Sequence, residues 1–179
     1  MKKLLFILAF ALAMFQVRAQ YAAVKVGGGY ILGQESVKDQ ATSLDVVIGF
    51  QVRDYLYVGM LTGVQGPLSG SFDHDGVFAL PMLADVTLSI PNSTRVQPIL
   101  DLAFGYQFGV AHTKFSMPDY DEAPGFVRMH AMPGMNIRIN DRYALEIVGG
   151  YTKLNHSLGD YGINTLSLEG KISLVVTLF

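Results

Sequence analysis

The chain has 179 residues, enough for one domain, and is 50% hydrophobic but only 16% charged, with a mean hydropathy of +0.33. It contains no cysteine, which excludes disulfides, thiolate metal ligands, cysteine nucleophiles and a lipid anchor on an N-terminal Cys. The formal net charge of −2 excludes the basic surface that nucleic-acid binding needs. Because a soluble domain is typically about 25% charged, this composition favours a membrane protein.

Residues 1–19 have the layout of a secretory signal peptide. Two lysines precede an unbroken apolar run of twelve residues, and Ala19 followed by Gln20 forms the predicted cleavage site. A helix that crosses a bilayer needs about 20 apolar residues, so this run is too short to span one. Cleavage removes three positive charges and takes the formal net charge of residues 20–179 from −2 to −5. We therefore expect the mature chain to leave the cytoplasm. A buried N-terminal strand or an uncleaved anchor is the alternative.

After the leader, apolar residues alternate with small or polar ones, which is the period of a β-strand with two different faces. In the segment 96–110, for example, Leu100 and Phe104 share one face, and Asp101 lies on the other. The longest later apolar run has only eight residues and contains a proline, so no spanning helix is predicted. Eight strands are predicted, at residues 21–33, 44–52, 55–66, 76–90, 96–110, 125–139, 143–154 and 163–179.

The connections between these strands alternate between long and short. This is the pattern of a barrel with long loops at one mouth and tight turns at the other. Lipid offers no partner to an open sheet edge, so a sheet that spans a membrane must close. The predicted fold of residues 20–179 is therefore all-β: an eight-stranded antiparallel up-and-down transmembrane β-barrel. Its four long connections are predicted at residues 34–43, 67–75, 111–124 and 155–162.

A lipocalin-like soluble barrel or β-sandwich, with its apolar face turned inward, is the alternative. Two features weigh against it. Ionisable residues recur at mid-strand on one common face, and the opposite face is too continuously apolar to be covered by water.

The chain resembles the small eight-stranded outer-membrane barrels of the OmpA/OmpX type, and more narrowly the "outer membrane protein beta-barrel domain" family of Gram-negative bacteria. The residues that carry the likeness are the tight hairpin 49–59, the strand pair 80–86 and 97–106, the segment 133–138, and the terminal Phe179. The resemblance implies residence in the cell outer membrane. It also implies contact with membrane lipid and lipopolysaccharide, and assembly by the barrel assembly machinery.

The strand ends carry aromatic residues. The resemblance implies that Phe179 is the insertion signal, although Phe179 falls off the apolar series of Leu174, Val176 and Leu178. A bulge or a twisted chain end would reconcile the two. Tyrosines near strand ends are predicted to form the girdles typical of membrane barrels; they are Tyr21, Tyr30, Tyr55, Tyr57, Tyr106, Tyr143 and Tyr151.

The inward face is predicted to hold a charge network. An eight-stranded barrel is just wide enough for side chains to fill it, and buried charges are tolerated when they are paired. We therefore expect a dry, plugged lumen; a proton or ion path along the same residues is the alternative. The predicted members are Lys25, Asp45, Asp85, Asp101, Arg128, His130, Arg138, Glu146, Glu169 and Lys171.

The long connections are acidic and hold three of the four histidines. Solvated loops explain this most simply, but carboxylate oxygens could hold a hard divalent cation, and histidine adds the option of a transition metal. The weak metal candidates are Asp73, His74, Asp75, Asp119, Asp121 and Glu122.

Serine, histidine and acid also coincide in these connections, as they do in lipid A acyltransferases and deacylases, which share this barrel size. The combinations are His156 and Ser157 with Asp160, or Ser69 and Ser71 with His74. No G-x-S-x-G motif is present, so no catalytic residue and no cofactor is predicted.

The sequence thus predicts a monomeric barrel with a structural or surface-interaction role, in which the long connections contact any extracellular ligand. A small-solute or ion channel is the first alternative, and a lipid A-modifying enzyme is the second.

Overall fold

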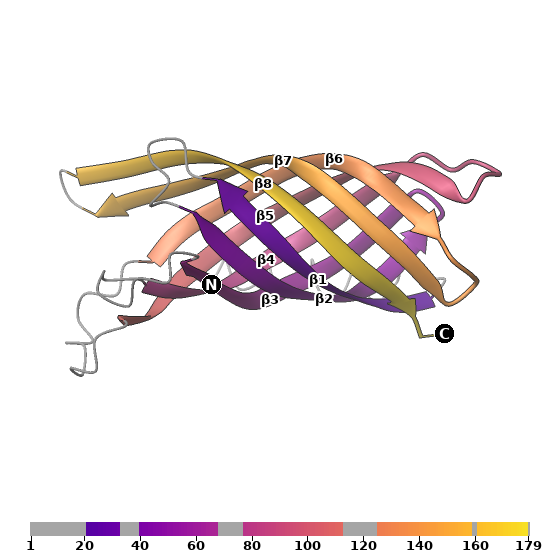
Figure 1. The fold of residues 1–179 in the computed structure, drawn as a ribbon, viewed down its shortest axis with the longest axis horizontal. Helices are drawn as coiled ribbons and strands as arrows, with labels where there is room; N and C mark the ends of the chain where they lie inside the picture. The colour runs from indigo at the N-terminus through magenta and orange to yellow at the C-terminus, as the bar shows by residue number, and fades with distance from the viewer. Residues whose placement is uncertain (1–20, 33–39, 68–76, 113–124, 159–160, 179) are drawn as a thin grey trace, which may run out of the picture.

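The structure is a computed structural model that describes residues 21–32, 40–67, 77–112, 125–158 and 161–178 (Figure 1). Each strand pairs antiparallel with the next, and β8 pairs with β1, so the sheet closes into a barrel. The predicted fold class, an eight-stranded antiparallel barrel, is therefore confirmed. The strands are β1 (Tyr21–Leu32), β2 (Ala41–Arg53), β3 (Leu56–Pro67), β4 (Val77–Ser89), β5 (Val96–His112), β6 (Gly125–Arg138), β7 (Tyr143–Leu158) and β8 (Tyr161–Thr177).

Alternation along each strand separates an apolar exterior from a mixed interior, because successive side chains of a strand point to opposite faces of the sheet. On β5, Leu100 and Phe104 are exposed on the outside, whereas Asp101 and Ala103 are buried inside. Leu44 is 62% exposed and Asp45, its neighbour on β2, only 4%. The apolar face of the strands therefore points outward and the charged face points inward, as in a membrane barrel.

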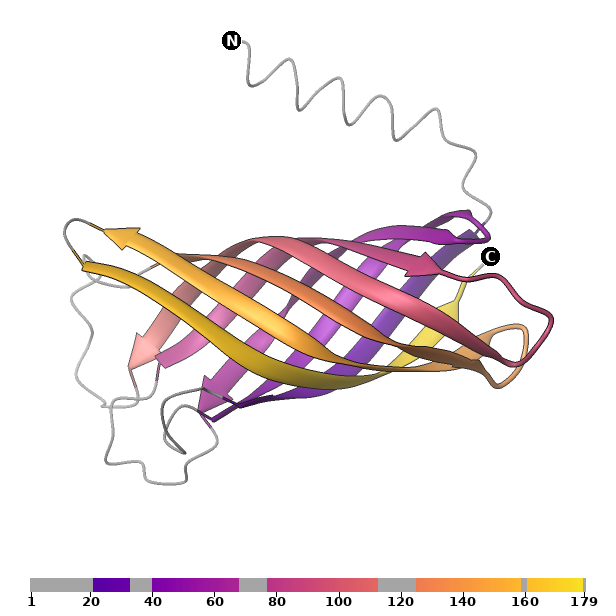
Figure 2. The ribbon, with the colours of Figure 1, turned by 90° about the horizontal axis from the view of Figure 1, so that it is seen from above.

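The two mouths differ. The short connections, at residues 54–55, 90–95 and 139–142, lie at the end of the barrel where the C-terminus also lies (Figure 2). At the other end, the fourth connection differs from its prediction. β7 and β8 stay paired up to Leu158 and Tyr161, so the predicted long loop at 155–162 is wrong.

The barrel closes along β1 and β8. Their register runs from Ala23 opposite Thr177 to Leu32 opposite Leu168, and the backbone N–H of Leu178 donates to the carbonyl of Ala22 at 2.8 Å. Phe179, the predicted insertion signal, lies outside the described residues, as does the predicted signal peptide. The described residues include no helix long and apolar enough to cross a membrane.

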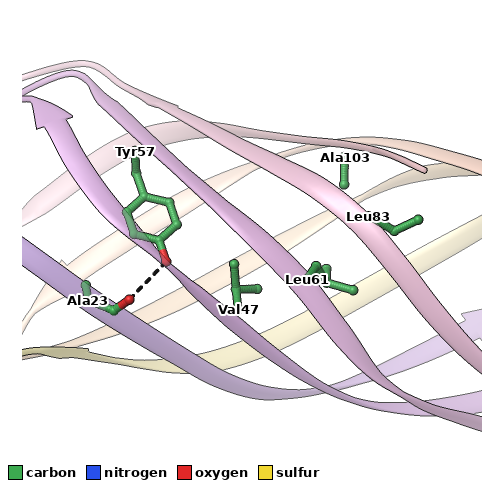
Figure 3. Packing of buried hydrophobic residues seen from close by; sticks show 6 residues of the cluster. All are labelled: Ala23, Val47, Tyr57, Leu61, Leu83 and Ala103. Carbon is green, nitrogen blue, oxygen red and sulfur yellow. Dashed lines mark hydrogen bonds between the residues drawn. The ribbon is translucent and has the colours of Figure 1, made fainter. Parts of the chain in front are cut away.

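Part of the interior is apolar. Ala23, Val47, Tyr57, Leu61, Leu83 and Ala103 form one buried cluster, drawn in Figure 3, and Ile99, Met132 and Val148 form a second. The Tyr57 hydroxyl donates to the carbonyl oxygen of Ala23 at 3.1 Å. Assigning Tyr57 to an interface girdle was therefore wrong: a tyrosine can be buried when its hydroxyl finds a partner.

Candidate functional site in the barrel lumen

Nine of the ten residues predicted for the lumen network are buried. They lie at inward-facing positions of seven strands, all except β3, so their side chains face one another across the lumen. Polar residues that the sequence prediction omitted accompany them, among them Ser43, Thr87, Gln107 and Thr152, all buried. The inward register of Thr87, Gln107 and Thr152 was readable from the sequence, whereas Ser43 falls in the predicted connection 34–43. The role of all four as hydrogen-bond partners was not readable, because it depends on which strands face each other across the lumen.

The turn-side cluster comprises Lys25, Asp85, Thr87, Asp101, His130 and Glu146. The Lys25 ammonium on β1 donates to Thr87 Oγ1 at 2.6 Å and lies 3.1 Å from Glu146 Oε2 on β7. It is also 3.7 Å from Asp101 Oδ1 and 3.8 Å from Asp85 Oδ1. One ammonium therefore serves three carboxylates on three strands, and it lies 4.7 Å from the centre of the Tyr57 ring.

Within the turn-side cluster, β4, β5 and β6 bring Asp85, Asp101 and His130 together. His130 Nε2 lies 3.2 Å from Asp101 Oδ2, and one potential ligand atom from each of the three residues lies within 4.8 Å of the others. All three side chains are buried. Two carboxylates and one imidazole form a donor set able to hold a divalent metal ion.

The loop-side cluster is built around the buried pair Arg128 and Glu169, which comes from β6 and β8. Arg128 Nη2 lies 2.9 and 2.7 Å from the two Glu169 oxygens, and Nη1 donates to Gln65 on β3 and to Gln107 on β5. The Thr152 hydroxyl also donates to Glu169. The remaining members are Lys171, 3.0 Å from Asp45 Oδ2, and Ser43, which donates to the same Asp45 oxygen.

The two clusters differ in charge. The loop-side cluster pairs two cations, Arg128 and Lys171, with two carboxylates. In the turn-side cluster, Lys25 is the one fixed cation that the described residues place beside the three carboxylates. The prediction that Arg138 belongs to the lumen network is wrong. Arg138 ends β6 at the turn mouth, where its side chain is exposed. A side chain with an inward register at the end of a strand faces the water at the barrel mouth, not the buried interior.

A vestibule of about 290 Å³ opens at the turn end of the barrel. Tyr21, Gln97 and Arg138 are among the residues that line its walls, and Lys25, Thr87 and Glu146 line its inner end. Tyr21 therefore faces the vestibule and is not part of an exterior girdle. Beyond Lys25, a cavity of about 10 Å³ lies between the two clusters, bordered by Asp85, Asp101 and Lys171 among others.

The remaining candidates lie in β7 or outside the described residues. His156 and Ser157 lie in β7, not in a loop. The metal candidates Asp73, His74, Asp75, Asp119, Asp121 and Glu122 lie outside the described residues, as do Ser69, Ser71 and Asp160.

A closed barrel with an apolar exterior and a buried charged interior is the architecture of a transmembrane β-barrel. No protein-family model matches the chain, and no curated protein matches its sequence. Solved structures do match its fold. Neisserial surface protein A has a TM-score of 0.63 at 12% identity, over 88% of this chain and 97% of that one.

Two proteins of Pseudomonas aeruginosa are also similar. The outer membrane protein OprG has a TM-score of 0.57 at 11% identity, over 89% of this chain and 97% of that one. The N-terminal barrel domain of OprF has a TM-score of 0.51 at 6% identity, over 88% and 98%. The chain thus has the fold of the small eight-stranded outer-membrane β-barrels, as the sequence resemblance implied.

Proposed function

We propose that this protein is an integral barrel of the cell outer membrane, with a structural role in the envelope, a lumen closed by paired charges, and no catalytic activity. The connections at residues 33–40, 68–76 and 113–124 are the segments through which it would contact surface ligands, and lipid and lipopolysaccharide would surround it.

The apolar exterior supports the membrane location. Large apolar side chains that are more than half exposed recur on several strands, including Ile48, Met60, Phe104 and Ile172. A soluble monomer rarely exposes a continuous apolar surface of this kind. In a bilayer, the same side chains face hydrocarbon at no cost.

The observation that carries the closed-lumen proposal is that charged side chains bridge the barrel from wall to wall. Lys25 connects β1 to β4, β5 and β7, and Arg128 connects β6 to β3, β5 and β8. An ion that passed through the barrel would have to separate both sets of contacts in a low-dielectric interior, where an unpaired charge costs several kcal/mol, about 3–5 kcal/mol when one partner is removed.

Conductance in planar bilayers tests this proposal. The refolded protein should give no steady single-channel steps, measured beside an Arg128→Ala/Glu169→Ala variant, which removes a balanced pair and widens the path. Brief openings confined to the variant would agree with a lumen closed by these side chains. Steady unitary steps in the unmodified protein would instead establish the small-solute or ion channel.

A further inference from the structure

We propose that Asp85, Asp101 and His130 form a buried site inside the barrel that binds one divalent transition-metal ion of the zinc type. This goes beyond the structural role proposed above, and its failure would leave that role untouched. The proposal starts from charge: within the described part of the chain, Lys25 is the single fixed cation beside the three buried carboxylates of the turn-side cluster.

The unused hydrogen-bonding capacity of Asp85 is the second observation. Neither carboxylate oxygen of Asp85 has a hydrogen-bond partner among the described residues, although the side chain is only 1% exposed. Unpartnered buried polar atoms are rare in folded proteins, so the Asp85 carboxylate calls for a further partner such as a water molecule or an ion.

The geometry suits a small metal ion. Zinc binds nitrogen and oxygen at about 2.0–2.2 Å, which sets neighbouring tetrahedral ligands roughly 3.3 Å apart. The His130 Nε2 to Asp101 Oδ2 distance is 3.2 Å, and one possible ligand atom from each of Asp85, Asp101 and His130 lies within 4.8 Å of the other two. The adjoining cavity of about 10 Å³ is close to the space that one water molecule needs, so it offers room for a solvent ligand.

The donor set also selects the kind of ion. Calcium and magnesium take oxygen ligands, whereas an imidazole beside two carboxylates suits zinc and its first-row neighbours. The ion would enter from the vestibule, because Lys25 lies at the vestibule's inner end and within 4 Å of both aspartates. The Lys25 ammonium would keep Thr87 and Glu146 as partners when it gives up the two aspartates to the ion.

Zinc retention by the full chain, purified without a histidine tag, tests the site. The reference protein is the variant His74→Gln/His112→Gln/His156→Gln, in which His130 is the one remaining histidine of the four in the chain. We expect it to keep one zinc ion per chain after gel filtration. Its X-ray absorption spectrum should contain a single imidazole nitrogen among oxygen ligands.

In the same background, Asp85→Asn and His130→Gln should each weaken zinc binding at least tenfold in competition with a chelator. Altered gel migration of the unboiled samples establishes that the variants are folded. The proposal is overturned if the reference protein retains no zinc or its zinc spectrum lacks imidazole. It is equally overturned if a folded lumen variant binds zinc as tightly as the reference. Because the spectrum needs no lumen substitution, it decides the question even if both variants misfold.

Discussion

Arg128 is fully buried, and its guanidinium is held by one carboxylate and two amide side chains. A buried ion pair adds little net stability compared with apolar groups of the same size, because both charges lose their hydration. Removing one partner alone is expensive, because the other charge stays buried. The stability of the barrel therefore depends more on Arg128 and its partners staying together than on the presence of the charge itself.

Replacing Arg128 by Met should destabilise the barrel by about 3–5 kcal/mol, because Glu169 loses its closest cation. The double variant Arg128→Met/Glu169→Leu should recover much of this loss, since Lys171 keeps Asp45 as its partner. Urea unfolding in lipid vesicles measures both. The exposed Arg53→Ala serves as the control and should change stability by less than about 0.5 kcal/mol. A double variant less stable than the single one would contradict this account.

At the scale of the strand, two adjacent glycines of β7 have different surroundings. A Cβ on Gly150 would lie 2.8 Å from the Met132 Cα on β6, whereas a Cβ on Gly149 would find its nearest neighbour at 3.8 Å. Gly150 faces the packed interior and Gly149 faces outward. Gly150 therefore permits a close approach of the β6 and β7 backbones, whereas Gly149 leaves room for a side chain.

Gly150→Ala should lower the unfolding free energy by about 1–3 kcal/mol, the usual cost of overpacking, because the added methyl group meets backbone atoms that cannot rotate away. Gly149→Ala is the matched control and should be close to neutral. Equilibrium unfolding of the two variants side by side makes the comparison, and equal losses would rule out the steric explanation.

The outward register of β5 leads to another prediction at this scale. Phe104 is 60% exposed in the middle of the strand, and Ile139 is 56% exposed at the turn that follows β6. An arginine on the lipid face costs about 2–4 kcal/mol at the bilayer midplane and about 0–1 kcal/mol near the interface. Phe104→Arg should therefore destabilise the barrel in vesicles far more than Ile139→Arg. Similar losses for both would argue against a bilayer around β5.

At the scale of the whole molecule, closure leaves no strand with an unpaired edge among the eight described strands. A closed hydrogen-bonded cylinder resists detergent, so an unboiled sample should migrate differently from a boiled one in an SDS gel. The protein should also fractionate with outer membranes. Recovery in the soluble periplasmic fraction, together with identical migration before and after boiling, would favour the soluble alternative.

The sequence by itself determined the strands and their two faces, and hence which face points out of the barrel. The reason is local: a period of two residues assigns every side chain of a strand to one face, whatever the strand pairs with. Leu100, Asp101 and Phe104 lie where this rule puts them. The rule fails at strand ends, where the inward register of Arg138 opens to water, and at residues 155–158, which read as a loop but pair with β8.

Only the tertiary structure decided which inward residues meet. Lys25 and Glu146 are 121 positions apart in the chain, and their contact depends on closure between β1 and β8 and on the register of every strand between them. The same registers bring Asp85, Asp101 and His130 together and leave one ammonium among three carboxylates. The alternation along the chain shows how many charged residues lie on one face of the sheet. The distances between those residues across the lumen are set only when the sheet closes.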